Sequence, residues 1–516
     1  VRQKWSGMSR VFSLSEPSEA AIRAWAQARG IPILEIDPST IDTSRFMGWY
    51  KYWTQVPLSN GSLQRLIVGD IDRNGRPEAY GTYRDFASRD FETRTYEIDS
   101  AGSIGYLYNY GQPRPGLSRL LFDVDRDSLL EVVFWFNGLV SDYEQNVPNA
   151  LPIQWRFSHQ VFQGNAAAGF TGIFVGPLDA DSLTDFLYQG SEPDSSDTTR
   201  GVVKTYVAEY NPILNNFRRV WSRSLFDALG GFAVDDFDLD GRKEFVASDL
   251  FGRVYVVENT GDNTYQLVMR DSLPFVNVYY QTSGDVDNDG KPEFFVGAVM
   301  GDGYWLTMYE AEGNNQYVKK LFIHFLSGDL FPTNLTTDVD GDGKLELAVM
   351  AGRDLYILKA NANDSYYLWY LKREDRKDAL GLHDFNRDGK MDLIISKSEV
   401  NSLGELHYYS DVYLASSTVY VGEKNSAAIP ESFRLRAYPN PFNPQVKIEY
   451  TLPSRQHIVI SVFDVLGNEV ANLIDAAGES GTNFASWNAE GRASGVYFVR
   501  LLAQGRSSIQ KLILIR

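Results

Sequence analysis

The sequence predicts an all-β protein in which seven similar units of short strands are followed by a small second β-domain. Three observations lead to this prediction. An acidic loop pattern recurs at nearly regular steps between residues 70 and 392, apolar runs flank each copy, and alternating strands separated by Pro, Gly and Asn fill the last 80 residues. Hydrophobic residues are 43% of the chain and aromatic residues 14%, which is enough to build buried cores.

The repeated loop has the form D-x-[DN]-x-[DN]-x-x-x-[DE], with acidic or amide side chains at positions 1, 3, 5 and 9. Position 1 falls at residues 70, 123, 177, 236, 285, 338 and 384, which gives steps of 53, 54, 59, 49, 53 and 46 residues. A period of this order indicates a solenoid, a propeller or an array. Regular spacing therefore points to one repeated structural unit.

Apolar segments complete each unit. One run precedes the loop, as in RLIVGD, a second follows it, as in EFFVGA, and a hairpin such as GRVYVVENTGDNTYQLVMR comes next. Four short strands per unit are typical of a propeller blade. We therefore expect a seven-bladed β-propeller over residues 46–424.

The loops have the ligand pattern of a calcium site. Ca²⁺ prefers six to eight oxygen ligands, and alternate residues of a curled loop can aim their oxygens inward. Oxygen-only ligation disfavours zinc and copper, and Mg²⁺ suits such a loop poorly. We expect about five to seven Ca²⁺ ions, with position 7 contributing its backbone carbonyl. The predicted ligands are Asp70, Asp72, Asn74, Arg76 and Glu78; Asp123, Asp125, Asp127, Leu129 and Glu131; Asp179, Asp181 and Asp185; Asp236, Asp238, Asp240, Arg242 and Glu244; Asp285, Asp287, Asp289, Lys291 and Glu293; Asp338, Asp340, Asp342, Lys344 and Glu346; Asp384, Asn386, Asp388, Lys390 and Asp392.

The alternative interpretation is a set of Asp- and Gly-rich turns without ions. Five copies have Gly at position 6, which permits the sharp turn. The second copy has Ser128 there, and the first has Asn74 in place of an Asp. The third begins with Pro177 and has lost a ligand, so it is the copy that we expect to be empty.

Composition excludes several classes of site. The absence of cysteine excludes disulfides, iron–sulfur clusters and thiol catalysis. No HExxH, GxSxG, P-loop or dinucleotide motif occurs, so no catalytic residue is predicted. The formal charge of −18 argues against a nucleic-acid partner, and no apolar run is long enough for a transmembrane segment. A start at Val1 without a signal sequence fits a mature exported form.

Residues 1–45 differ from the repeats and predict a helix followed by a strand. EPSEAAIRAWAQARG has Ile22 and Trp25 on one face and Gly30 at its end, and the strand IPILEI follows. This segment is expected to cap the propeller, with a partner-binding element as the alternative. The aromatic segment RFMGWYKYWTQV is a candidate for the strand that joins the first and last blades.

Residues 437–516, after a linker at 425–436, predict a small immunoglobulin-like β-sandwich. Strands such as HIVISVFDV and GVYFVRLL alternate with turns rich in Pro, Gly and Asn. Pro439, Pro441 and Pro444 cannot lie in a central strand, so they mark the entry to this domain.

Two resemblances extend this interpretation. The acidic loops resemble the FG-GAP and VCBS repeats of integrin α-chain propellers and many bacterial surface proteins, which implies calcium between the first and second strands of each blade. AYPNPFNPQVKIEYTLP, VFDVLGNEVANLI and ASGVYFVRLLAQG resemble the C-terminal sorting domain of type IX secretion in Bacteroidetes. That resemblance implies contact with the secretion machinery, export across the outer membrane, and release or attachment at the cell surface. An accessory immunoglobulin-like module without a sorting role is the alternative.

We therefore expect a secreted or cell-surface binding or adhesion protein whose ligand is a polysaccharide or another protein. One alternative is a structural subunit that self-assembles into an extracellular filament. Another is a polysaccharide-degrading enzyme, with Asp179, Asp181, Glu310 and Glu312 as candidate acids. Six aromatic side chains would either stack on sugar rings or lie in the blade core: Trp135, Phe136, Tyr279, Tyr280, Tyr304 and Trp305.

Overall fold

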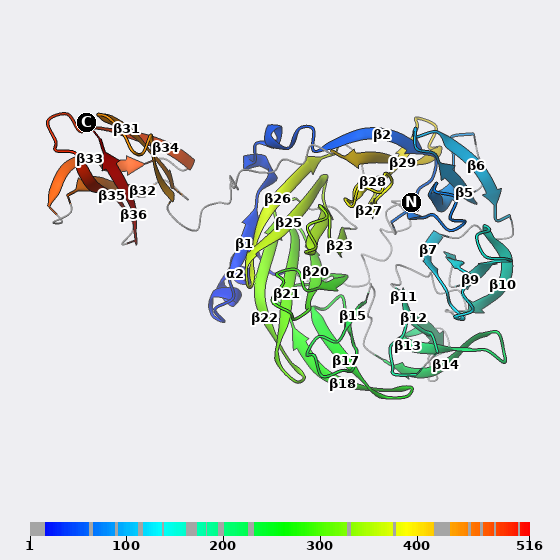
Figure 1. Ribbon diagram of the computed structural model, residues 1–516. Helices are drawn as coiled ribbons and strands as arrows, with labels where there is room; N and C mark the ends of the chain where they lie inside the picture. The colour runs from blue at the N-terminus through cyan, green and yellow to red at the C-terminus, as the bar shows by residue number, and fades with distance from the viewer. Residues whose placement is uncertain are drawn as a thin grey trace. The chain divides into compact units, whose positions relative to one another are not determined.

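The computed structural model divides into two compact units, Val1–Val421 and Gly422–Arg516. It is all-β, as predicted, with a single α-helix among the described residues (Figure 1). In this part of the chain no helix is long and apolar enough to cross a membrane. The described residues are 16–60, 65–87, 91–111, 117–136, 139–160, 173–181, 183–193, 201–224, 232–327, 332–374, 378–416, 434–452, 456–464, 468–478, 481–503 and 506–515.

Seven sheets follow one another along the described part of the first unit. The first three contain β3 (Ile67–Gly69), β4 (Glu78–Tyr83), β5 (Glu92–Ile98) and β6 (Ile104–Asn109); β7 (Leu117–Phe122), β8 (Glu131–Phe136), β9 (Leu139–Gln145) and β10 (Pro152–Gln160); β11 (Ile173–Gly176), β12 (Asp185–Pro193), β13 (Gly201–Asn211) and β14 (Asn216–Arg223). The next two contain β15 (Ala233–Asp235), β16 (Glu244–Ser248), β17 (Arg253–Gly261) and β18 (Thr264–Ser272); β19 (Val278–Gly284), β20 (Glu293–Met300), β21 (Gly303–Gly313) and β22 (Gln316–Phe325). The last two contain β23 (Thr333–Thr337), β24 (Glu346–Ala351), β25 (Asp354–Ala362) and β26 (Ser365–Arg373); β27 (Ala379–His383), β28 (Asp392–Val400), β29 (Leu406–Ala415) and β2 (Tyr50–Val56).

Each acidic loop has the same place in its sheet. It joins the first strand to the second, and its position 9 is the first residue of the second strand in all seven sheets. Within a sheet, hydrogen-bonded neighbours are antiparallel, apart from one parallel strand added to the fifth. The seventh sheet is completed by β2, from the aromatic segment near the N-terminus, which pairs with β29.

Neighbouring sheets pack against one another, and the seventh also contacts the first. Strand contacts link the first and second sheets (β3 with β7), the second and third (β10 with β14), the fourth and fifth (β15 with β19), the fifth and sixth (β19 with β23) and the seventh and first (β27 with β3). Shared apolar clusters link the remaining neighbours. One cluster includes Leu187 of the third sheet and Phe245 of the fourth, and another includes Leu358 of the sixth and Leu393 of the seventh.

The N-terminal segment packs on the fifth sheet. Helix α2 (Glu19–Gln27) buries Ile22 completely and stacks Trp25 on Phe322 of β22, with 6.0 Å between ring centroids. Strand β1 (Ile33–Ile36) then pairs in parallel with β22. Two 3₁₀ turns, Pro38–Thr40 and Thr43–Phe46, lead to β2. The helix and strand predicted for this segment are therefore both present.

The second strands of the central sheets are buried along their whole length. Every residue of β20 and of β24 is buried, so apolar neighbours cover both faces. Tyr304 and Trp305 on β21 are 0% exposed, which assigns these two aromatic residues to the core rather than to a sugar-stacking surface. The side chains of the other four aromatic candidates, Trp135, Phe136, Tyr279 and Tyr280, lie outside what the structure describes.

The second unit contains two antiparallel sheets in its described residues. One consists of β30 (Arg434–Tyr438), β31 (Gln445–Leu452) and β34 (Gly481–Asn488), and the other of β33 (Glu469–Gly478), β32 (Gln456–Phe463), β35 (Gly495–Ala503) and β36 (Arg506–Leu514). Ile448 of the first sheet and Ile460, Val499 and Leu512 of the second share one buried cluster. The three prolines lie outside the strands, as expected, but they connect β30 to β31 within the first sheet rather than mark the entry to the domain. The domain's first strand, β30, pairs with β31 and begins at Arg434, inside the segment predicted to be a linker.

Candidate metal sites

All seven acidic loops share one hydrogen-bond framework. The position 9 carboxylate accepts a hydrogen bond from the backbone N–H of position 2 at 2.7–2.9 Å. In the six loops with Asp at position 1, the position 1 carboxylate accepts a hydrogen bond from the backbone N–H of position 6 at 2.8–3.3 Å. These bonds gather the acids: in loops 236–244 and 285–293, one oxygen from each of the four acids lies within 4.8 Å of the others.

The position 9 acids are deeply buried, and several have an oxygen without a partner. All seven are at most 1% exposed. One oxygen of Glu78, Asp185, Glu244 and Glu293 has no hydrogen-bond partner among the described residues. Burial raises the pKa of Glu293 to about 9 and that of Glu244 to about 8, and the other acids of each loop add to the rise. The ionised form of such a buried carboxylate destabilises the fold unless a cation neutralises it or a proton binds to it.

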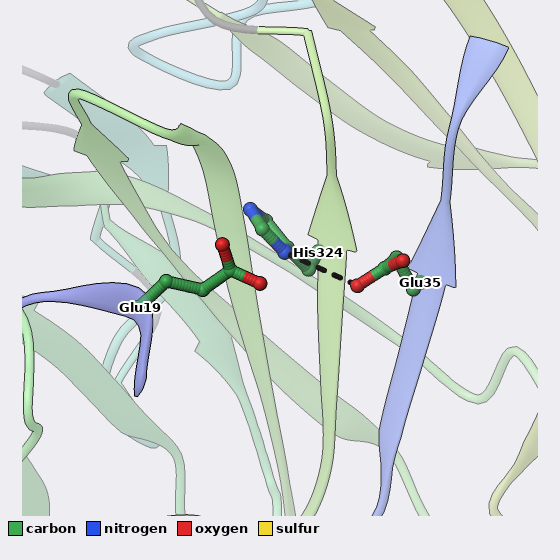
Figure 2. Close-up of side chains that lie close together, drawn as sticks. All are labelled: Glu19, Glu35 and His324. Atoms are coloured by element: carbon green, nitrogen blue, oxygen red, sulfur yellow. Dashed lines mark ion pairs between the residues drawn. The ribbon is translucent and has the colours of Figure 1, made fainter. Parts of the chain in front are cut away.

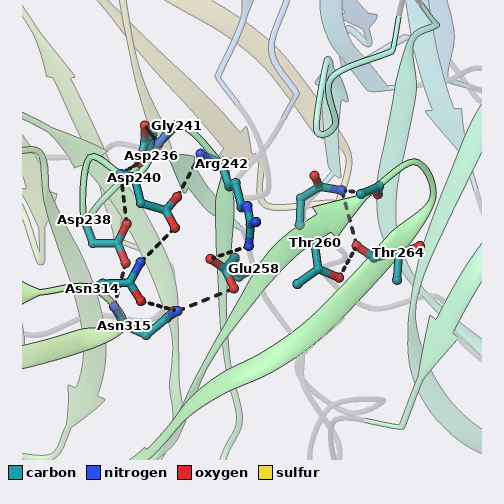
Figure 3. Close-up of polar contacts among 12 residues, drawn as sticks. Asp236, Asp238, Asp240, Gly241, Arg242, Glu258, Thr260, Thr264, Asn314 and Asn315 are labelled. Atoms are coloured by element: carbon teal, nitrogen blue, oxygen red, sulfur yellow. Dashed lines mark hydrogen bonds and ion pairs between the residues drawn. The ribbon is translucent and has the colours of Figure 1, made fainter.

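The hairpin of the following sheet docks onto several loops. Figure 3 shows this for loop 236–244, where the Asn315 backbone N–H donates to Asp238 at 2.6 Å and the Asn314 side chain donates to Asp240 at 2.8 Å. Asn315 has a left-handed φ of 58°. Its Oδ1 is buried and has no hydrogen-bond partner among the described residues. Each such loop therefore lies at the junction of two successive sheets.

The acidic loops before and after loop 236–244 are contacted by the next hairpin in the same way. In loop 285–293, the Asp364 backbone N–H donates to Asp287 at 2.7 Å, and in loop 177–185 the Asn263 N–H donates to Asp179 at 2.9 Å. The side-chain Oδ1 atoms of Asp364 and Asn263 are buried, again without a hydrogen bond within the described chain. These Asn and Asp residues are potential ligands that the nine-residue loop pattern does not contain.

A further acidic residue faces position 9 from the third strand, and we call it the opposing residue. It is Glu97, Glu144, Glu209, Glu258 and Glu310 in the first five sheets. Glu258 is 4% exposed and Glu310 is 1% exposed, and each has one oxygen without a hydrogen bond to any described residue. These residues lie outside the nine-residue loop pattern and were not predicted as ligands, although a Glu recurs at this point of each hairpin in YEID, YEQN, AEYN, VENT and YEAE.

Position 7 side chains, which are themselves exposed to solvent, pair with some of the opposing residues. Arg76 lies 3.0 Å from Glu97, Arg242 lies 3.8 Å from Glu258, and Lys291 lies 3.1 Å from Glu310, measured between nitrogen and oxygen. Lys320 also lies 3.6 Å from Glu310 and 3.2 Å from Glu312. The acids considered for catalysis at 310 and 312 are therefore engaged in ion pairs, and Asp179 and Asp181 belong to a loop framework.

Basic side chains approach the second and third loops. In loop 123–131, Arg156 donates to Asp125 at 2.7 Å and also pairs with the opposing Glu144. In loop 177–185, Lys243 donates to the carbonyl of Pro177 at 3.0 Å, and Arg126 donates to the carbonyl of Leu183, at position 7, also at 3.0 Å. Both of these carbonyls are thus already hydrogen-bonded in the copy that lacks a first ligand.

The first, sixth and seventh loops also differ from the pattern of the fourth and fifth. Arg387 pairs with Asp70 of the first loop. In the sixth, Lys359 contacts three of the predicted ligands. Burial by itself raises the pKa of Asp342, but the hydrogen bonds from Lys359 and the Lys344 N–H, together with the charges of both lysines, lower it overall. In the seventh, Asp392 accepts backbone hydrogen bonds on both oxygens, from Phe385 at 2.9 Å and from Ala415 at 2.6 Å.

The residues fit Ca²⁺ best in loops 236–244 and 285–293. There the donor set consists of oxygen atoms, as Ca²⁺ requires. Each of these loops combines an unpartnered position 9 oxygen, an unpartnered oxygen of the opposing Glu, and an unpartnered Asn or Asp oxygen from the next hairpin, counting hydrogen bonds among the described residues. A hard cation at this junction would satisfy buried acceptors that lack a hydrogen bond in the described chain, although the free oxygen of Glu258 also has Arg242 at 3.8 Å.

A second cluster, drawn in Figure 2, combines His324 with Glu19 and Glu35. His324 is 0% exposed and stacks on Trp305 at 3.7 Å between centroids, and its Nδ1 lies 3.9 Å from Glu35. Arg23 already pairs with both glutamates, at 2.7 Å from Glu19. Arg23 therefore offsets part of the negative charge of the two glutamates, and the cluster joins α2 and β1 to the fifth sheet.

Comparison with protein-family models gives two matches. Residues 436–515 match the secretion system C-terminal sorting domain, and residues 236–296 match the FG-GAP-like repeat. The sorting domain marks the chain for export by type IX secretion, to the cell surface or the extracellular space, and implies contact with that machinery. Among curated protein sequences, none matches this chain.

Several solved structures are similar at low sequence identity. BBS1N, solved in complex with ARL6DN, is 12% identical with a TM-score of 0.45, covering 72% of this chain and 98% of that one. A fungal alcohol oxidase in complex with copper is 11% identical with a TM-score of 0.44, covering 91% and 100%. PorZ, a surface component of the type IX secretion system of Porphyromonas gingivalis, is 16% identical with a TM-score of 0.34, covering 86% and 58%. At these TM-scores the similarities carry no inference about fold or function.

Proposed function

We propose that this chain is an exported binding or adhesion protein, built as a seven-bladed β-propeller with calcium at the junctions between blades and an immunoglobulin-like sorting domain. Seven successive units with four antiparallel strands each, the fifth extended by β1, support the propeller, because each is in contact with the next and the last with the first. The single observation that carries the calcium assignment is the buried position 9 carboxylate, as in Glu244 and Glu293. One oxygen of each has no hydrogen-bond partner among the described residues.

Calcium would have a structural role in this protein. Side-chain oxygens of positions 1, 3, 5 and 9 and the carbonyl of position 7 would hold the ion. Bound there, the ion supplies positive charge that neutralises carboxylates which otherwise repel one another. Because Asp238 and Asp287 are also hydrogen-bonded by the next sheet, the loop framework ties each ion site to the contact between sheets. Binding would therefore contribute directly to the stability of the folded unit.

The chemistry of the acids favours binding over catalysis. Glu310 is paired with lysines, and Asp179 accepts a backbone hydrogen bond from Asn263 within its loop junction. A glycosidase needs two carboxyl groups on either side of one bond, free to transfer protons. The acids considered for that role are instead engaged in ion pairs and loop hydrogen bonds. The proposed ligand is an extracellular polysaccharide or a protein of the cell surface.

The test uses the full chain loaded with Ca²⁺ and a panel of polysaccharides and cell-surface proteins. We expect retention of at least one ligand at unchanged chain length, and loss of retention in the presence of a chelator. The double variant Asp287→Ala, Asp289→Ala should bind one ion fewer per chain than the wild type when bound metal is counted. Shortened polysaccharide would contradict the binding function, and an unchanged metal count would contradict the calcium assignment for loop 285–293.

A further inference from the structure

The charge of the opposing residue is negative in the first five sheets and positive in the sixth. Phe294 pairs with Tyr309 in the fifth sheet and Leu347 with Leu358 in the sixth. One step further along each ladder, Glu293 lies opposite Glu310, whereas Glu346 lies opposite Lys359. Equivalent backbone positions in neighbouring sheets thus present a carboxylate to one loop and an ammonium to the other.

Lys359 lies among the predicted calcium ligands of loop 338–346. Its Nζ is 2.7 Å from Asp340, 2.8 Å from Asp342 and 2.9 Å from Glu346, which are positions 3, 5 and 9 of the loop. The Lys359 side chain is 11% exposed, and that of Glu346 is 1% exposed. Three carboxylates at hydrogen-bond distance satisfy all three N–H donors of the ammonium.

The ammonium and a calcium ion would compete for the same oxygens. Both need the inward-facing oxygens at positions 3, 5 and 9, and two cations held a few ångströms apart in a partly buried site repel each other strongly. In loop 285–293 the corresponding oxygen of Glu293 has no hydrogen-bond partner in the described chain, and Lys291 and Lys320 approach Glu310 rather than the loop acids.

We propose that the opposing residue selects the cation of each junction, so that Glu258 and Glu310 favour a calcium ion while Lys359 replaces the ion with its own ammonium. Loop 338–346 then binds no calcium, although its nine residues match the loop pattern in full. This inference rests on the proposed calcium binding of the other loops. It makes one junction independent of calcium concentration.

The primary experiment counts bound calcium per chain by elemental analysis after dialysis into calcium buffer. Lys359→Glu should bind one ion more than the wild type. Lys344→Glu is the matched control, because it makes the same charge change at an exposed side chain of the loop that Lys359 contacts. It leaves both the Lys359 ammonium and the backbone carbonyl of position 7 in place. It should bind the wild-type number. The reciprocal change, Glu258→Lys, should bind one ion fewer.

A second pair of variants keeps the inference testable if Lys359→Glu does not fold. Asp340→Asn should leave the calcium count unchanged, whereas Asp287→Asn, at the same position of the fifth loop, should lose one ion. A wild type that binds calcium but loses an ion with Asp340→Asn would overturn the inference alone, as would a folded Lys359→Glu with no gain. A wild type that binds no calcium would overturn the calcium assignment in the proposed function, and this inference with it.

Discussion

Glu293→Gln is the substitution that most directly separates a calcium ligand from a structural hydrogen-bond acceptor. In the calcium-free chain, Glu293 accepts a hydrogen bond from the Val286 N–H at 2.9 Å, and burial raises its pKa to about 9. The carboxyl is therefore largely protonated at pH 7, and an uncharged amide of nearly the same shape can replace it. We expect the melting temperature of Glu293→Gln to equal or exceed that of the wild type in chelator.

With calcium the order should reverse, because the amide is a weaker ligand than a carboxylate. A site filled at a calcium concentration about 100 times its Kd contributes about 2.7 kcal/mol. For residues 1–421, an unfolding entropy of about 2.1 cal/mol/K per residue amounts to about 0.9 kcal/mol/K. Loss of one ion should therefore lower the melting temperature by about 3 °C.

The assay is thermal unfolding of both proteins in calcium and in chelator, followed by circular dichroism. Glu346→Gln is the matched control, because its carboxylate pairs with Lys359, and it should lower the melting temperature equally in both buffers. An equal decrease for Glu293→Gln in calcium and in chelator would refute the reasoning, since Glu293 would then serve only as a hydrogen-bond acceptor in the fold.

Two further predictions concern the first unit. Burial lowers the pKa of His324, so the folded state binds fewer protons than the unfolded state. Stability should therefore fall as the pH drops below the ordinary histidine value of about 6.5. Between pH 7.5 and 5.5 the urea midpoint should fall less for His324→Phe than for the wild type, and parallel curves of midpoint against pH would contradict this. A Cβ on Gly252, at φ +84°, would lie 2.2 Å from the Phe275 carbonyl oxygen, whereas Gly404, at φ +80°, has open space. Gly404→Ala should cost about 1–2 kcal/mol in urea unfolding and Gly252→Ala clearly more, and equal costs would contradict the clash.

The repeated loops were predictable because their information is local. Each loop and the strands around it fall within about twenty residues, and the loop curls through hydrogen bonds among its own backbone groups, as in Asp285 accepting from Gly290. The all-β class and export were also predictable, since strand patterns and the sorting sequence are short and specific. The helix and strand within residues 16–36 follow in the same way from a short amphipathic pattern.

The rest of each junction depends on contacts between strands and sheets that no short pattern contains. Whether Glu310 or Lys359 faces a loop is set by the register of a hairpin, and whether Asn315 reaches Asp238 is set by the packing of one sheet on the next. The aromatic residues present the same difficulty. Trp305 stands between Tyr304 and Leu306, so no alternation of polar and apolar residues shows which way it faces. All three side chains are buried in the structure, which places Trp305 in the core.

The location of the acidic loops determines what calcium removal should do to the molecule. The strand-to-strand backbone ladders continue away from the loops, but the contacts of Asp238 with Asn315 and of Asp287 with Asp364 cross between sheets. Removal of calcium should therefore loosen the junctions after the fourth and fifth sheets before it affects the sheets themselves. Loop 338–346 carries its own ammonium and contacts the seventh sheet through the Met391 N–H and Val339 carbonyl, 2.9 Å apart. Hydrogen exchange in chelator should accordingly rise at 236–244 and 285–293 and remain slow at 338–346, and equal increases at all three would show that the lysine does not replace the ion.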